Sequence, residues 1–231
     1  MWQRLAMGSL VACSLGLGCA EDRFIYRPTE QATATVDGLP AARYEVPPER
    51  PVGNVLVASP GVVEAKFQSG VTSHLLSVRM VIENNQDDTP WTVDTREQRA
   101  IVQGAGDSAP AYVNTDGQSP PILEVLRGEK HTIDLYFPLP ANADDPKHVP
   151  EFDFAWQVHT SDRAVADRTS FDRMRLEPVY DEPYFYSWGL APYWWYDPLW
   201  RGPSYVAPTF RYYRARPVYF RVAARPGPSH H

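Results

Sequence analysis

Apolar and polar residues alternate with a period of two in three segments in the middle of the chain. The apolar positions are Leu76, Val78, Met80 and Ile82; Ile133, Leu135, Phe137 and Leu139; and Phe152, Phe154, Trp156 and Val158. This period is typical of a β-strand with one buried face. Because half-buried strands need a second layer over their apolar side, the pattern predicts an antiparallel all-β domain with these side chains in its core.

Weaker strand patterns surround these segments, separated by turn-forming sequences such as 84–88, 104–107, 127–129 and 142–146. The weaker strands are Asn54–Ala58, Val62–Phe67, Trp91–Asp94, Gln98–Val102, Ala111–Asn114, Ile122–Leu126 and Phe171–Glu177. Many short strands at this spacing predict a single antiparallel β-sandwich over residues 53–177. Trp156 is similar to the core tryptophan of immunoglobulin-like sandwiches, so we expect an Ig-like architecture without the inter-sheet cysteine pair.

Residues 19–52 have a different composition from the predicted domain. They are polar, show little periodicity and contain five prolines: Pro28, Pro40, Pro47, Pro48 and Pro51. Proline-rich polar segments form extended linkers. We therefore expect a Pro-rich tether that joins the N-terminal segment to the sandwich.

Residues 178–231 form a third part that is rich in aromatic residues and arginine. This part contains nine Tyr, four Trp and three Phe, and it has six Arg and no Lys. Tyr, Trp and Arg dominate binding hot spots because they combine a large contact area with polar groups. The predicted binding residues are Trp188, Tyr193, Trp194, Trp195, Tyr196, Trp200 and Arg201.

Two structures remain open for this C-terminal segment. Its frequent prolines predict an irregular segment that presents the aromatic side chains to a partner. Alternatively, the segment folds back over the sandwich and buries its rings, with Val218, Phe220 and Val222 on a late strand.

The N-terminus has the three parts of an export signal. Arg4 is followed by an uncharged apolar stretch from Leu5 to Gly18, and small residues lie at the junction with Cys19. The stretch is too short to cross a bilayer of about 30 Å as a permanent helix. Residues 1–18 are therefore predicted to be a cleaved signal peptide.

The junction Leu15-Gly16-Leu17-Gly18-Cys19 resembles the lipobox of bacterial lipoproteins, in which the cysteine is acylated and becomes the first residue. Leu10-Val11-Ala12-Cys13 also matches a lipobox, so Cys13 is the alternative lipidation site. The longer apolar stretch before Cys19 favours that site. The resemblance implies a lipid anchor, and Ala20 after the cysteine implies sorting to the outer membrane.

Both cysteines lie in the first 19 residues, so a disulfide within the predicted domain is excluded. The net charge of −6 argues against nucleic acid as a partner. The histidines show no metal-ligand spacing, and the chain has no G-x-S-x-G or glycine-rich phosphate motif.

We therefore expect no catalytic residue, metal or cofactor. The predicted function is a non-catalytic, lipid-anchored envelope protein that binds another envelope protein or the cell wall. The alternatives are a peptidoglycan or carbohydrate binder that uses the aromatic segment, and an envelope hydrolase without a recognisable motif.

Overall fold

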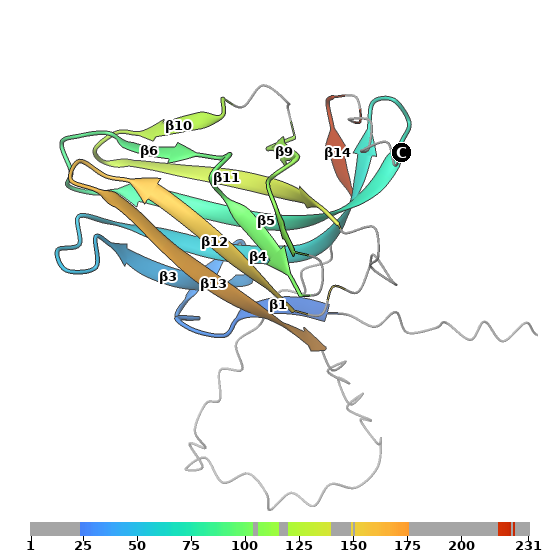
Figure 1. The fold of residues 1–231 in the computed structure, drawn as a ribbon, viewed down its shortest axis with the longest axis horizontal. Coiled ribbons are helices and arrows are strands. Elements are labelled where there is room, and N and C mark those ends of the chain that lie inside the picture. The colour runs from blue at the N-terminus through green and yellow to red at the C-terminus, as the bar shows by residue number, and fades with distance from the viewer. Residues whose placement is uncertain are drawn as a thin grey trace, which may run out of the picture.

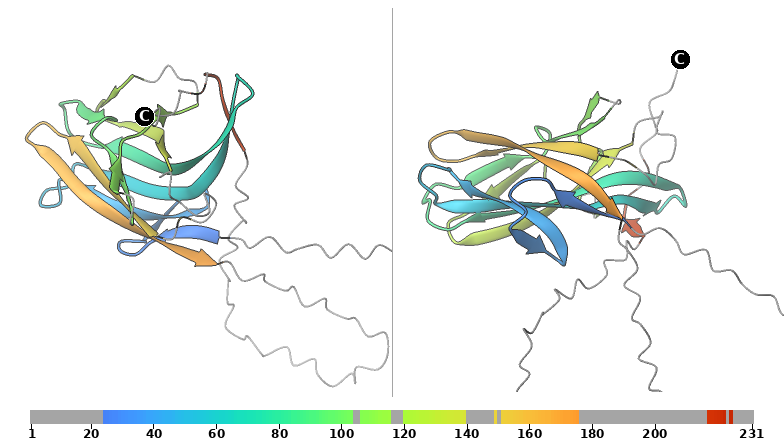
Figure 2. Two further views of the ribbon diagram at one scale, coloured as in Figure 1. Left: turned by 45° about the vertical axis from the view of Figure 1, so that its right-hand side comes forward. Right: turned by 90° about the horizontal axis from the view of Figure 1, so that it is seen from below.

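A computed structural model of the chain describes residues 24–103, 106–115, 120–139, 149, 151–175, 217–222 and 224. The regular secondary structure of these residues consists of β-strands alone. The strands form two seven-stranded sheets that pack face to face (Figures 1 and 2). The predicted all-β sandwich is therefore confirmed.

Sheet A has the strand order β1-β13-β12-β6-β10, and β7 and β8 extend it from β12. Its strands are β1 (Phe24–Pro28), β6 (Trp91–Asp94), β7 (Arg99–Val102), β8 (Gly106–Ser108), β10 (Ile122–Val125), β12 (Glu151–His159) and β13 (Ala164–Arg175). Its strand pairs are antiparallel.

Sheet B has the order β2-β3-β4-β5-β11-β9, and β14 pairs with β4. Its strands are β2 (Ala34–Val36), β3 (Leu39–Val46), β4 (Gly53–Phe67), β5 (Thr72–Asn84), β9 (Tyr112–Val113), β11 (Glu129–Pro138) and β14 (Val218–Phe220). Its strand pairs are antiparallel except β14 with β4, which is parallel.

The main core lies between the sheets and contains the side chains that the alternating pattern predicted. The alternating apolar positions predicted for β5 and β12 are all buried there, as are Ile133, Leu135 and Phe137 of β11. Leu139 is partly buried at the margin of this core. Most weaker predicted strands are also present, as β4, β6, β7, β9 and β10.

Among the described residues the sandwich starts with β1 at Phe24, so most of the segment predicted to be a tether belongs to the fold. β1, β2 and β3 lie in this segment, and Tyr26, Tyr44 and Val46 are buried in the main core. Two prolines fit because they lie where strand pairing is limited. Pro28 ends β1, and Pro40 pairs only with the short strand β2.

Part of the C-terminal segment also belongs to the fold, as the second of its two predicted structures required. β14 pairs in parallel with residues 65–67 of β4. Phe220 is buried there and stacks on Phe67, with ring centroids 4.9 Å apart. Tyr136 and Tyr112 complete this second apolar cluster. Residues 217–222 and 224 therefore cover one end of sheet B.

Candidate functional site

The residues predicted to be functional lie outside the described part of the chain. Cys13 and Cys19 precede Phe24, and all seven predicted aromatic and arginine binding residues lie between residues 176 and 216. The structure therefore places neither group directly. It does place the points at which the described part of the chain meets both segments.

These two points lie side by side at one edge of sheet A. β1 and β13 are antiparallel, and Phe24 at the start of β1 is in register with Arg175 at the end of β13 (Figure 1). The N-terminal and aromatic segments therefore adjoin the sandwich at the same place. The 41 residues from 176 to 216 connect this place to β14 in sheet B.

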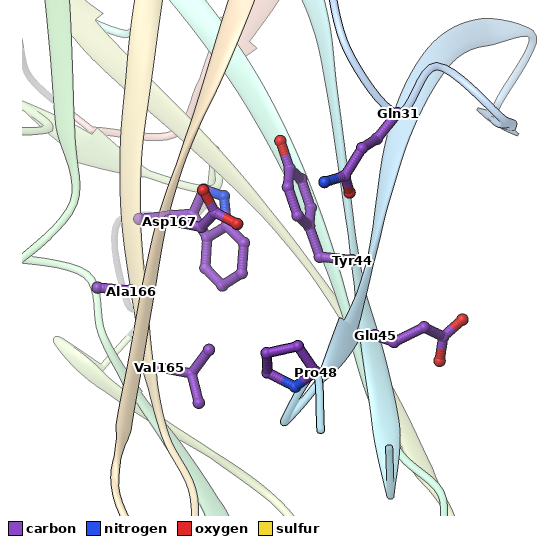
Figure 3. Close-up of a pocket in the computed structure, with 8 residues that line it drawn as sticks. Gln31, Tyr44, Glu45, Pro48, Val165, Ala166 and Asp167 are labelled. Atoms are coloured by element: carbon purple, nitrogen blue, oxygen red, sulfur yellow. The ribbon is translucent and has the colours of Figure 1, made fainter. Parts of the chain in front are cut away.

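A hollow opens between the sheets, where β3 faces β13 (Figure 3). Its volume is about 180 Å³. The lining residues are Gln31, Tyr44, Glu45, Pro48, Trp156, Val165, Ala166 and Asp167. Tyr44 and Asp167 extend toward the space, whereas the carboxylate of Glu45 points away from it (Figure 3).

The hollow forms because only part of this side of the sandwich is closed by the chain. Between β1 and β2 the chain crosses from sheet A to sheet B, and it hydrogen-bonds to both. Thr29 N donates to Ser170 O over 3.0 Å, and Arg43 N donates to Gln31 O over 3.1 Å. In the described residues no strand pairs with the corresponding edge of β13 from Ala164 to Thr169.

Two contacts across this side bound the hollow. Tyr44 Oη and Thr169 Oγ1 share a hydrogen bond of 2.8 Å, and Arg163 pairs with Glu49. The first contact joins β3 to β13. The second joins the residues after β3 to the β12–β13 turn. They hold the two sheets together on either side of the opening.

Trp156 gives the hollow its distinctive chemistry. This side chain is 2% exposed, and its Nε1–H has no hydrogen-bond acceptor among the described residues. Its ring meets Tyr44 edge to face, with centroids 5.0 Å apart. A buried N–H without an acceptor costs free energy, so an acceptor that reached it would bind favourably.

Asp167 adds negative charge beside these rings. It is in register with Trp156, and one carboxylate oxygen accepts a hydrogen bond of 2.7 Å from Arg168 N. Burial raises the pKa of Tyr44, and the hydrogen bond with Thr169 partly opposes this rise. The nearby carboxylates of Asp167 and Glu30 raise the pKa further. The hollow therefore has a carboxylate acceptor in its lining, whereas the Nε1–H of Trp156 is buried behind it.

Other polar clusters in the described residues have structural partners. Asp87 accepts hydrogen bonds from Trp91 Nε1 at 3.0 Å and Ser161 Oγ at 2.8 Å. His159 lies 2.8 Å from Glu97, and His131 lies 3.1 Å from Glu129. In the part of the chain that the structure describes, no group of three His, Cys, Asp or Glu side chains could hold a metal ion.

Sequence reasoning did not identify Tyr44 or Asp167. Tyr44 lies in the predicted tether, although Tyr44 and Val46 alternate with Arg43 and Glu45 as in a strand. Asp167 lies before the predicted start of the last strand and has no motif around it. Only the alternation around Tyr44 was a usable signal.

No protein-family model matches the chain, and neither the curated proteins nor the solved structures include a significant match. In a separate observation, the described residues contain no helix that is long and apolar enough to cross a membrane.

Proposed function

We propose that this chain is a lipid-anchored, non-catalytic protein of the cell envelope that binds a partner next to the outer membrane. Acylated Cys19 attaches it to the membrane, and the aromatic segment around Trp188–Arg201 provides the binding surface. The sandwich is the rigid body that holds these two segments together, and its architecture is Ig-like around the buried Trp156.

The register of Phe24 with Arg175 is the observation that carries this proposal. Five residue steps separate Cys19 from Phe24, which corresponds to about 18 Å of extended chain. The aromatic segment begins beside the same strand end. An acyl anchor at Cys19 therefore keeps the start of the aromatic segment close to the membrane, where envelope proteins and the cell wall are available as partners.

Lipidation is tested by mass spectrometry of the protein purified from its own envelope. We expect a mature chain that begins at Cys19 and carries the mass of a diacylglyceryl group and an amide-linked acyl chain. A Cys19→Ser variant should lose this mass and the membrane association, whereas Cys13→Ser should keep both. A mature chain without lipid mass would refute the anchor.

Binding is tested by crosslinking the acylated protein in its envelope and identifying the captured molecules. The comparison is a variant with Trp188, Trp194, Trp195 and Trp200 changed to Ser, which keeps β14 and its buried Phe220 in place. We expect the variant to lose the captured partner. Identical capture by both proteins would refute a binding role for the aromatic segment.

A second assay distinguishes the two classes of partner. Isolated peptidoglycan is incubated with the acylated protein and with the four-Trp variant. Retention that depends on the tryptophans would identify the cell wall as the ligand, and capture of a specific protein without such retention would identify a protein partner.

A further inference from the structure

The edge of β13 that faces β1 is open over part of its length. Ser170 O accepts a hydrogen bond from Thr29 N on this edge. Along a strand, the N–H and C=O groups of every second residue point to the same edge, so those of Ala164 and Ala166 point there too. β1 pairs only with residues 171–175, and no described strand pairs with the earlier part of this edge. The N–H and C=O groups of Ala166 therefore have no partner among the described residues.

Ala166 does not use these groups toward its other neighbour, β12. Its register partner there is Gln157. Gln157 N donates to Gln98 Oε1 over 3.0 Å, and Gln98 Nε2 donates to Gln157 O over 3.1 Å, so both backbone groups of Gln157 point away from β13. The pair of Ala166 and Gln157 thus shares no hydrogen bond. The Ala166 groups are available to a strand that approaches the open edge.

The hollow lies on the interior side of this open edge. Val165 and Asp167 share the interior face of β13 with the buried Thr169, and they line the hollow together with Ala166 (Figure 3). A strand paired with Ala166 would place two of its side chains opposite Val165 and Asp167. Both side chains would point into the hollow, because opposite residues lie on the same face of a sheet.

We propose that the open edge of β13 binds an extended segment of a protein partner, which adds an antiparallel strand to sheet A at Ala166. One residue of such a segment satisfies both groups of Ala166, because an antiparallel pair exchanges two hydrogen bonds. The segment has a basic residue opposite Asp167 and an apolar residue opposite Val165. This site is separate from the aromatic segment, and it does not depend on acylation of Cys19.

Asp167 determines the charge of the partner. Its carboxylate has no ion pair among the described residues, whereas the nearby arginines are paired, Arg168 with Asp153 and Arg163 with Glu49. A basic side chain opposite Asp167 supplies the missing cross-strand ion pair. A second copy of this chain fits the edge less well. Symmetric pairing through Ala166 would place two Asp167 carboxylates diagonally across the pair and leave both without a cation.

The other end of the hollow is apolar and accessible. Val165 and Pro48 approach each other across the opening (Figure 3). Ala164 and Ala166 are exposed on the outer face, and their small side chains do not obstruct a strand. At residue 168 the edge is already occupied, because Arg168 N donates to Asp167. A short extended segment with its apolar residue two positions after its basic residue therefore fits residues 164–167.

The test is an NMR titration of isotope-labelled residues 19–231 that carry Cys19→Ser and cannot be acylated. The probe is the capped peptide Lys-Thr-Val-Thr, which places Lys opposite Asp167, its first Thr opposite Ala166 and Val opposite Val165. We expect the peptide to shift the amide signals of residues 164–167. No shift there at peptide concentrations up to about 10 mM would overturn the inference.

Two control peptides test the two parts of the inference on the unchanged protein. Methylation of the backbone nitrogen of the first Thr removes the donor to Ala166 O and should weaken binding about fivefold. Glu in place of Lys should also weaken binding about fivefold, because it puts two carboxylates opposite each other. Equal binding of the methylated and parent peptides would overturn strand addition.

Protein variants test the same contacts from the other side. Ala166→Pro removes an N–H that no described strand uses, which an edge strand tolerates, and should weaken binding about fivefold. Asp167→Asn keeps an oxygen for Arg168 N but loses the charge, and should weaken binding of the Lys peptide about threefold. Asp172→Asn, an exposed carboxylate on the same strand, should change nothing.

The remaining outcomes also separate this inference from the proposed function. Equal binding by Asp167→Asn and the unchanged protein would overturn the basic partner. Dimerisation of the unchanged protein that Ala166→Pro abolishes would identify a second copy as the occupant and would overturn the inference too. Losses in the expected pattern would support it even if Cys19 were not acylated and the aromatic segment bound nothing.

Discussion

Two buried tryptophans of this sandwich differ in one polar contact. Trp91 Nε1 donates to Asp87, and Asp87 also binds Ser161, so the β5–β6 turn is joined to the β12–β13 turn. Burial opposes ionisation of Asp87, but the hydrogen bonds from Ser161, Trp91 and the backbone hold its pKa below the ordinary value. Trp156 Nε1 has no such partner in the described residues.

This difference predicts unequal costs for the same substitution. Trp91→Phe and Trp156→Phe remove a similar volume, but only the first removes a hydrogen bond to a carboxylate. We expect Trp91→Phe to lower the free energy of unfolding by about 1–2 kcal/mol more than Trp156→Phe, as measured by urea denaturation. Equal losses would show that the Nε1 of Trp156 is also satisfied in solution.

Position 61 requires glycine for two reasons: its backbone conformation and the close approach of the Tyr26 ring. Its φ is +79°, and a Cβ atom built on it would lie 2.3 Å from Cε2 of Tyr26. The Tyr26 ring is fixed, because it is buried and its hydroxyl donates to Val149 O over 2.5 Å. Gly70 has the same φ but no atom within 4 Å of such a Cβ.

Gly61→Ala and Gly70→Ala therefore separate backbone strain from steric overlap. Gly70→Ala should cost about 1 kcal/mol of stability, because it adds only strain at positive φ. Gly61→Ala should cost a further 1–3 kcal/mol, roughly the cost of overpacking a core. Chemical denaturation of both variants measures the difference, and similar values would show that Tyr26 moves aside.

At the scale of strands, β14 has one fully buried side chain, Phe220. It has three residues, and Phe220 inserts between Phe67 and Tyr136, whereas Tyr219 is 67% exposed. Arg221 N donates to Thr115 O over 2.9 Å just beyond the strand. A strand this short cannot hold its position by backbone pairing alone.

We expect Phe220→Ala to release β14 without unfolding the sandwich. Amide exchange at Arg221 should become fast, while the amides of the β4–β5 pair stay protected. Tyr219→Ala should leave exchange at Arg221 unchanged. Retained protection at Arg221 in Phe220→Ala would mean that β14 is held by other contacts.

Strands with one apolar face were predictable, and strands at the margins were not. The alternation in β5, β11 and β12 identifies their buried faces because each packs across the whole core. The first half of β13 contains Asp167 and Arg168 and lies at a partly unpaired edge, so its sequence has little apolar alternation. β3 was missed because its neighbouring prolines resemble a linker.

At the scale of the whole molecule, the hollow could not be predicted from local sequence. Tyr44 and Asp167 are 123 residues apart, and they face each other only because the chain crosses between sheets after β1. The adjacency of the anchor and aromatic segments has the same origin in the β1–β13 register. Such relations depend on topology, which hydrophobic pattern alone does not specify.

The first three strands close the sandwich, and this gives a prediction for the whole chain. β3 pairs with β4 over six residue pairs, and β1 covers the end of β13. A chain of residues 53–231 would lack both and would expose the buried faces of Val55 and Val57. We expect it to show no cooperative thermal transition by near-ultraviolet circular dichroism, because its core is incomplete.

The control is residues 20–231, which lack only the signal and Cys19 and should melt cooperatively. If residues 24–46 were a tether, both chains would melt at the same temperature. Such a result would also remove the restraint between Cys19 and the sandwich, since about 30 more residues would then separate the anchor from the fold and allow it to stand far from the membrane. The same melting experiment therefore tests the fold and the short restraint between Cys19 and the sandwich on which the proposed function rests.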